Sequence, residues 1–176
     1  VRNLSKFFDD FQLHDINFSL PKGYIMGLIG PNGSGKTTTI KLILNMLKRS
    51  SGEIKIMGLD NIREEQRAKA KLGVVFDTNY FSDDWQVAQV EKSISVFYPN
   101  WSSQRFAQML RRFHIAPVKK VKELSKGMQM KLMLACAFSY DAKLLILDEP
   151  TSGLDPVSRD ELLQILSEYI EDGEHS

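Results

Sequence analysis

The stretch GPNGSGKT, residues 30–37, constrains the fold of this chain more than any other feature. It follows the apolar run YIMGLIG at 24–30 and leads into TTIKLILNMLK, where apolar residues recur at helical spacing. A strand that passes through a glycine-rich loop directly into a helix is the start of an α/β unit. The stretch also fits the pattern G-x-x-x-x-G-K-[ST] completely, in the strand-to-helix context that this pattern requires. We therefore expect an α/β protein with a phosphate-binding loop.

The residue types of this loop suit the phosphates of a nucleotide. Its three glycines let the backbone wrap closely and turn N–H groups inward, and the following helix adds its dipole. Lys36 can reach the β- and γ-phosphates, the Thr37 hydroxyl can ligate Mg²⁺, and Thr38 can bond near the α-phosphate. A glycine-rich turn that matches the pattern by chance is the alternative. The predicted ATP-binding residues of the loop are Gly30, Pro31, Asn32, Gly33, Ser34, Gly35, Lys36, Thr37 and Thr38.

Three dense apolar runs predict strands that are buried on both faces, as in a parallel sheet. They are YIMGLIG at 24–30, LGVVF at 72–76 and LLILD at 144–148. The segment around Phe7 to Leu13, together with NFSL, reads as a hairpin, and SGEIKIMG at 51–58 reads as a strand with a turn. These segments predict a small antiparallel β portion beside a mostly parallel core sheet.

Residues 78–127 have a different character, because helical spacing dominates and no strand-like run interrupts it. This segment predicts a small helical subdomain inserted between two strands of the sheet. The whole chain, 1–176, reads as one domain. Its first residue is Val1 rather than Met, and it stops at Ser176 directly after a helix-like segment. We therefore expect a domain that is truncated at both ends.

Composition excludes several classes of protein. Hydrophobic residues make up 43% of the chain and charged residues 26%, which is typical of a globular protein. A net charge of +1 does not indicate a broad positively charged surface for binding nucleic acid. The single cysteine, Cys136, cannot form an internal disulfide and fits a reducing compartment. No run approaches the roughly 18 apolar residues of a membrane span, and no signal peptide is visible.

The run LLILDEP supplies a second group of candidate residues. Asp148 ends a buried apolar run, where a carboxylate is costly unless a cation faces it. Mg²⁺, directly or through water, is the natural partner. Glu149 beside it can act as the general base for a water that attacks the γ-phosphate. Carboxylates often end strands, so this interpretation depends on the complete phosphate loop upstream.

The stretch KELSKGMQMKL, residues 122–132, contains an oddly placed lysine. Ser125 can cap the apolar helix that follows, but Lys126 puts a cation at the positive end of the helix dipole. Such a lysine is mildly unfavourable unless an anion arrives from elsewhere. We therefore predict that Lys126 adds positive potential toward an incoming phosphate.

Four motifs now stand in one order: GPNGSGKTT, LSKGM, LLILDEP and TSGLDP. In this order they resemble the nucleotide-binding domain of ABC (ATP-binding cassette) proteins, over nearly the whole chain. The resemblance implies a P-loop NTPase fold, ATP and Mg²⁺ as cofactors, and a head-to-tail dimer that sandwiches two ATP molecules. LSKGM stands where the family commonly has LSGGQ, and this variant is similar to that of certain bacterial exporter cassettes.

The resemblance also implies roles for single residues. Phe7 aligns with the aromatic residue that stacks on adenine, although Phe8 could take that role, or either could belong to the core of the hairpin. Asp77 stands where a glutamine usually contacts Mg²⁺ and the attacking water, so it is a candidate metal-binding and catalytic residue with Glu149 and Lys36. The remaining implied residues are the metal ligands Thr37 and Asp148, the signature residues Leu124, Ser125, Lys126, Gly127 and Met128, which face the ATP of the partner chain, and the D-loop residues Ser152, Gly153, Leu154 and Asp155.

The family's switch histidine has no counterpart in the chain, and His175, in the polar stretch EDGEHS, is not expected to replace it. The resemblance favours the ATPase subunit of a transporter, at the cytoplasmic face of the cell membrane, that powers export through a separate permease. Its partners would be a second cassette, identical or not, and the permease, with no nucleic acid. The alternatives are a soluble ABC ATPase of the translation or DNA-repair type and a weakly hydrolysing regulatory cassette.

Overall fold

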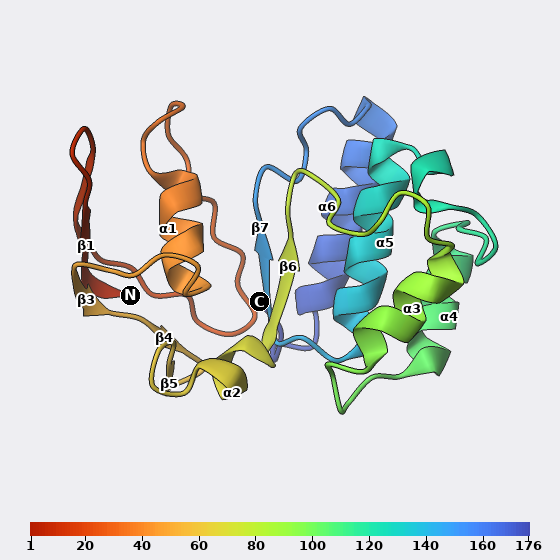
Figure 1. Ribbon diagram of the computed structural model, residues 1–176, viewed down its shortest axis with the longest axis horizontal. Helices are drawn as coiled ribbons and strands as arrows, with labels where there is room; N and C mark the ends of the chain where they lie inside the picture. The colour runs from red at the N-terminus through yellow and green to blue at the C-terminus, as the bar shows by residue number, and fades with distance from the viewer.

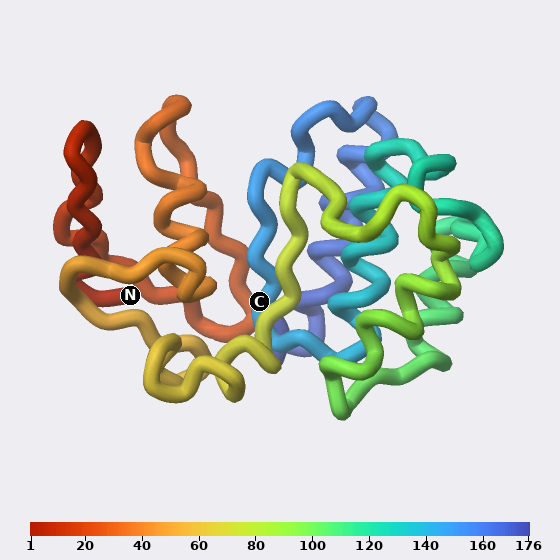
Figure 2. Tube along the Cα trace, in the orientation of Figure 1, coloured from red at the N-terminus to blue at the C-terminus, as the bar shows by residue number.

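A computed structural model describes residues 1–176 (Figure 1). Strands around the N-terminus lie on one side, two strands lie in the centre and most helices lie on the other side (Figure 1), and the trace in Figure 2 follows the chain in the same orientation. In chain order the elements are β1 Arg2–Phe7, β2 Gln12–Ile16, α1 Lys36–Ile43, β3 Ser51–Glu53, β4 Lys55–Ile56, β5 Leu59–Asp60, α2 Glu65–Lys69, β6 Leu72–Val75, α3 Val87–Ser95, α4 Ser103–Arg112, the 3₁₀ turn η1 Val121–Glu123, α5 Lys126–Ser139, β7 Leu144–Leu147 and α6 Pro156–Ile170. The α/β class predicted from the sequence is confirmed.

The antiparallel portion is a three-stranded sheet of order β2-β1-β3, with the pair β4 and β5 beside it. The predicted hairpin is present, but its strands are 2–7 and 12–16, so NFSL lies outside it. Gly52 adopts φ +92°, and a side chain there would come within 2.4 Å of the Asn3 carbonyl oxygen. Because L side chains rarely adopt this conformation, a glycine lets β3 approach β1 closely.

The parallel part of the structure is the pair β6 and β7, which align from Leu72 with Leu144 to Val75 with Leu147. The predictions that LGVVF and LLILD form parallel strands are therefore confirmed, but the residues of β7 are only partly buried and the parallel part is a two-stranded pair rather than a larger core sheet. α5 lies along one side of this pair (Figure 1). Gly73 makes this packing possible, since a methyl group there would lie 2.5 Å from Leu145 Cδ2 and 2.8 Å from Ala137 Cβ.

The prediction of a strand over residues 24–30 is wrong. This segment is irregular, and Tyr24 and Ile29 are 63% and 96% exposed. A cavity of about 1020 Å³ lies between residues 25–28 and β7, so no strand pairs with the segment. On this edge of β7, Leu145 N–H donates to the Ser176 carbonyl (2.7 Å) and Ser176 N–H donates to Lys143 (3.1 Å). An apolar run becomes a strand only where a neighbour completes its hydrogen bonds, and none lies there.

The larger hydrophobic core lies among the helices. α5 is its centre, with Leu132, Leu134 and Cys136 almost fully buried and Phe106 of α4 packed against the same cluster. The prediction that Cys136 is a core residue is confirmed. No helix combines the length and the apolarity that crossing a membrane would need.

Candidate nucleotide-binding site

The glycine-rich loop forms an open cradle at the start of α1. Gly33 and Gly35 have φ of +83° and +95°, and Gly35 is the N-cap of α1 without a side-chain hydrogen bond to the helix. The N–H groups of the first turn are therefore not capped by a side chain and remain free for an anion. The Lys36 ammonium folds back and donates to the carbonyls of Gly30 (2.8 Å) and Pro31 (3.1 Å). A bound phosphate could replace these carbonyls as the acceptor of the ammonium's hydrogen bonds without a large movement of the Lys36 side chain.

Two predicted metal ligands meet although they are 111 residues apart in the sequence. The Thr37 hydroxyl donates to Asp148 Oδ1 at 3.3 Å. Asp148 is held by its own backbone, whose N–H donates to the Val75 carbonyl at 2.9 Å. The structure therefore places the hydroxyl that opens α1 beside the carboxylate that follows β7.

Glu149 and Asp77 follow the same edge of the parallel pair. Because Val75 aligns with Leu147, these two residues lie at equivalent positions beyond β6 and β7. Glu149 has φ +51°, a left-handed conformation that costs free energy for a non-glycine residue and is common at functional sites. It lines the large cavity together with Lys36 and Asp148, whereas Asp77 is exposed and bonds to Thr78 (3.1 Å).

The aromatic residues of the first hairpin lie partly in solvent. Phe7 and Phe8 are 47% and 40% exposed, so the alternative that either is a core residue is wrong. Sequence reasoning missed Phe11, whose ring Cζ lies 3.0 Å from the position of a methyl group on Gly35. Phe11 also packs against Phe8 at 6.2 Å between ring centroids. The signal for it was the pair of aspartates in FFDDF, which marks a turn that folds Phe11 back toward Phe8.

The signature residues begin α5, as predicted. Ser125 is its N-cap, and its hydroxyl accepts from the Met128 N–H at 3.3 Å. The side chains lining the cavity with Lys36 and Glu149 include none of residues 124–128. Figure 1 nevertheless shows the glycine-rich loop, the ends of β6 and β7 and the start of α5 along one edge of the molecule. The signature thus shares this edge but not this cavity.

The D-loop residues connect β7 to α6 and pack against the signature. A methyl group on Gly127 would lie 3.4 Å from both Leu154 Cδ2 and Ser158 Oγ. Asp155 caps α6 by accepting from the N–H (3.0 Å) and hydroxyl (2.7 Å) of Ser158. These hydrogen bonds lower the pKa of Asp155 below its usual value.

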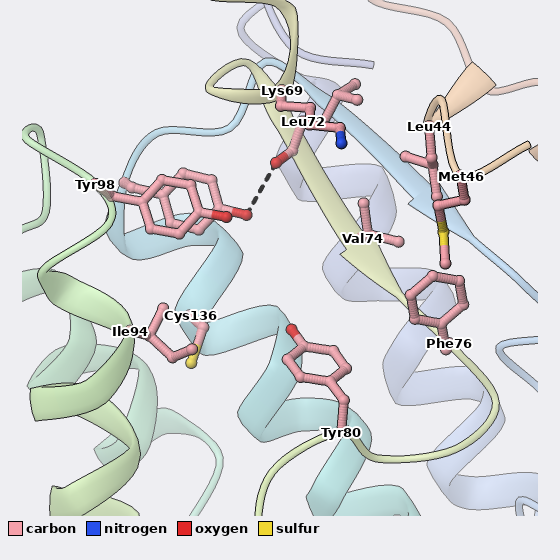
Figure 3. A pocket seen from close by; sticks show the side chains of 11 residues that line it. Leu44, Met46, Lys69, Leu72, Val74, Phe76, Tyr80, Ile94, Tyr98 and Cys136 are labelled. Atoms are coloured by element: carbon pink, nitrogen blue, oxygen red, sulfur yellow. Dashed lines mark hydrogen bonds between the residues drawn. The ribbon is translucent and has the colours of Figure 1, made fainter. Parts of the chain in front are cut away.

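A second, smaller cavity of about 300 Å³ lies between β6 and the helices α3 and α5, and Leu44 and Met46, just after α1, also line it (Figure 3). Ten of its 11 lining residues are hydrophobic. Tyr98 stacks on Tyr140 at 3.7 Å between centroids, and the Tyr140 hydroxyl donates to the Leu72 carbonyl at 2.9 Å. Burial raises the pKa of Cys136, which lines this cavity, so its thiol stays protonated and unreactive.

His175 is engaged away from the glycine-rich loop. Its Nδ1 lies 2.5 Å from Asp172 and its Nε2 lies 3.3 Å from Asp141. The structure therefore gives His175 a local role among these carboxylates. It does not bring the imidazole to the phosphate-binding loop.

Comparison with known proteins agrees with this geometry. The family model described as ABC transporter matches residues 13–152. The chain belongs to the ABC transporter family. It is 34% identical over 171 residues to the ABC transporter ATP-binding protein YtrB of Bacillus subtilis, covering 97% of the chain and 58% of YtrB. It is 31% identical to the lantibiotic transport ATP-binding protein SrtF of Streptococcus pyogenes, covering 98% of the chain and 75% of SrtF.

A solved structure of an ATP-binding subunit of an ABC transporter superposes on the chain with a TM-score of 0.85 at 28% identity. The superposition covers 97% of the chain and 74% of the solved subunit. The chain is therefore an ATP-binding domain of the P-loop NTPase class. The chain spans little more than half of the length of YtrB.

Proposed function

We propose that this domain hydrolyses ATP as the nucleotide-binding subunit of an ABC transporter and powers export through a separate membrane permease. The observation that carries the proposal is the contact between Thr37 and Asp148, with Glu149 next in sequence and Lys36 in the same cavity. Phosphate-binding, metal-binding and general-base groups are the parts that phosphoryl transfer to water requires. We further propose that residues 1–176 act as one domain and that 78–127 form its helical subdomain.

The donor set suits Mg²⁺ rather than a metal with a full protein cage. No group of three or more His, Cys, Asp or Glu side chains is placed to hold a metal ion. Thr37 and Asp148 offer one hydroxyl and one carboxylate, which leaves positions for waters and phosphate oxygens, as Mg²⁺ prefers. Bound Mg²⁺ would neutralise charge on the β- and γ-phosphates. Asp77, beyond the end of β6, could accept hydrogen bonds from water there.

Residues of the chain itself would bind the phosphates, activate the attacking water and contact the adenine. The backbone N–H groups of residues 32–35 and the Lys36 ammonium bind phosphate oxygens, which replace the loop carbonyls that Lys36 now contacts. Glu149 orients a water in line with the γ-phosphate and accepts its proton. The exposed ring of Phe7 is available to stack on adenine.

A second copy or a similar cassette would complete the site. The signature at the start of α5 does not line the cavity of its own chain. In a head-to-tail dimer, its helix N-terminus would instead face the γ-phosphate held by the partner chain. ATP binds this closed state better than the open one, so hydrolysis would release the dimer.

The substitution Glu149→Gln tests this function. The amide keeps the shape of the side chain but cannot accept a proton, so ATP turnover should fall by at least about 100-fold while ATP binding persists. Size-exclusion chromatography with ATP and Mg²⁺ should then show a dimer that is absent without nucleotide. Lys36→Ala is the matched control, because it should lose both turnover and the dimer. A Glu149→Gln protein that stays monomeric at saturating ATP would refute the dimer.

The apolar cavity of Figure 3 is the surface that we propose for the permease, which would place the domain on the cytoplasmic face of the membrane. Val96 and Phe97, at the end of α3, lie in sequence between Ile94 and Tyr98, which line the cavity. They are 75% and 74% exposed, and exposed apolar side chains of this kind favour an interaction surface. The name of SrtF supports a role in transport. Stimulation of ATP hydrolysis by a co-purified membrane subunit, and its loss in Phe97→Ser, would test this surface.

A further inference from the structure

The side chain of Lys126 lies across the D-loop of its own chain. A methyl group on Gly153 would sit 3.4 Å from Lys126 Cδ, 3.8 Å from Cε and 3.3 Å from Nζ. The end of the Lys126 side chain, from Cδ to Nζ, therefore lies in the space that a side chain on Gly153 would enter. Lys126 is exposed and belongs to the first turn of α5, so it reaches from the signature to the loop that follows the catalytic glutamate.

The rest of this loop is fixed at its two ends. At the start, Ser152 N–H donates to the Glu149 carbonyl at 3.0 Å. At the end, Asp155 caps α6. Between them, Gly153 has φ +70° and no side chain of its own to hold it. A glycine in such a position has high conformational freedom, and an overlying side chain restricts it.

We propose that Lys126 is a positioning residue that clamps the D-loop onto the signature helix of the same chain. Lys126 thereby connects the signature, which would face the nucleotide held by the partner chain, to Glu149 of its own chain. The inference deepens the proposed function and rests on it for the nucleotide part. A movement of the α5 N-terminus toward a nucleotide would pull on Gly153 through the lysine stem. Ser152 would pass that movement to the Glu149 carbonyl through its hydrogen bond.

The proposal assigns the clamp to the methylene stem, which separates it from a purely electrostatic role for the ammonium. Lys126→Met keeps an unbranched stem without charge, whereas Lys126→Gly removes both stem and charge. Lys119→Met is the control, because Lys119 is an exposed lysine before the signature that does not lie over the D-loop. Two measurements test the clamp. They are amide exchange at Ser152 and Leu154 in the nucleotide-free chain, and the Hill coefficient of ATP hydrolysis.

Lys126→Gly should speed exchange of the Ser152 and Leu154 amides by about tenfold and lower the Hill coefficient toward 1, because the loop opens more often. Lys126→Met and Lys119→Met should leave the exchange of these two amides close to that of the unaltered chain. Unchanged exchange in Lys126→Gly would overturn the clamp. Exchange in Lys126→Met as fast as in Lys126→Gly would also overturn it, because the charge alone would then matter. The exchange measurement needs no ATP, so a failure of the proposed ATPase function would show separately, as absent turnover in the unaltered chain.

Discussion

Gly73 shows how a single residue decides the fit between the parallel strands and the central helix. A methyl group there would lie 2.5 Å from Leu145 Cδ2, 2.8 Å from Ala137 Cβ and 3.1 Å from Ala142 Cβ. These distances are well inside van der Waals contact, and both alanine contacts come from the segment that packs on β6. The site has no flexible neighbour except Leu145, so the helix or the strand would have to shift.

Gly73→Ala should therefore lower the free energy of unfolding by about 1–3 kcal/mol through overpacking. Urea denaturation followed by circular dichroism would measure it. Gly27→Ala is the control, since its nearest neighbour would be 3.8 Å away and its φ is not positive. Equal midpoints for Gly73→Ala and the unaltered chain would show that α5 can move away from β6 at little cost.

At the scale of elements, the start of α6 depends on a carboxylate. Hydrogen bonds from the Ser158 hydroxyl and N–H lower the pKa of Asp155 in the folded state. A group with a lowered folded pKa stabilises the protein above its unfolded pKa, and this stability is lost as pH falls through the folded value. The melting temperature of the unaltered chain should exceed that of Asp155→Asn above about pH 5, and the difference should shrink below about pH 4.

Ser158→Ala checks the cause, because it removes the hydroxyl that makes the largest contribution to this shift. It should reduce the pH dependence of the melting temperature without abolishing it, since the Ser158 N–H still donates to Asp155. A difference between the unaltered chain and Asp155→Asn that stays constant from pH 3 to pH 7 would exclude a role for the charge of this cap.

Elements with local signals could be predicted from the sequence, and elements that need a distant neighbour could not. Ser125 caps α5, and α1 begins at Lys36, because capping and glycine geometry are local. The run 24–30 carries the same apolar signal as LLILD, yet only LLILD pairs with another strand. An apolar run shows that a segment prefers burial, but pairing depends on what lies beside it.

At the scale of the whole molecule, the candidate site joins segments far apart in the chain. The resemblance predicts that Thr37 and Asp148 belong to one site, but it indicates neither Phe11 nor the stem of Lys126. Phe11 and Lys126 act through packing on glycines, Gly35 and Gly153, that offer no side chain. Such contacts depend on which distant side chain comes to lie over a glycine, which no periodicity in the sequence encodes.

The large cavity between residues 25–28 and β7 leads to a prediction about the motions of the molecule. The amides of residues 24–30 donate to no backbone carbonyl, whereas residues 132–137 lie within the buried helix α5. In the nucleotide-free chain, the amides of 24–30 should exchange at close to the unprotected rate, and those of 132–137 should be protected by at least about 1000-fold. Addition of ATP and Mg²⁺ should slow exchange in 31–38, because phosphate oxygens would accept from the free N–H groups there. Hydrogen-exchange mass spectrometry with short peptides distinguishes these segments, and protection of 24–30 equal to that of β6 would mean that this segment pairs as a strand in solution.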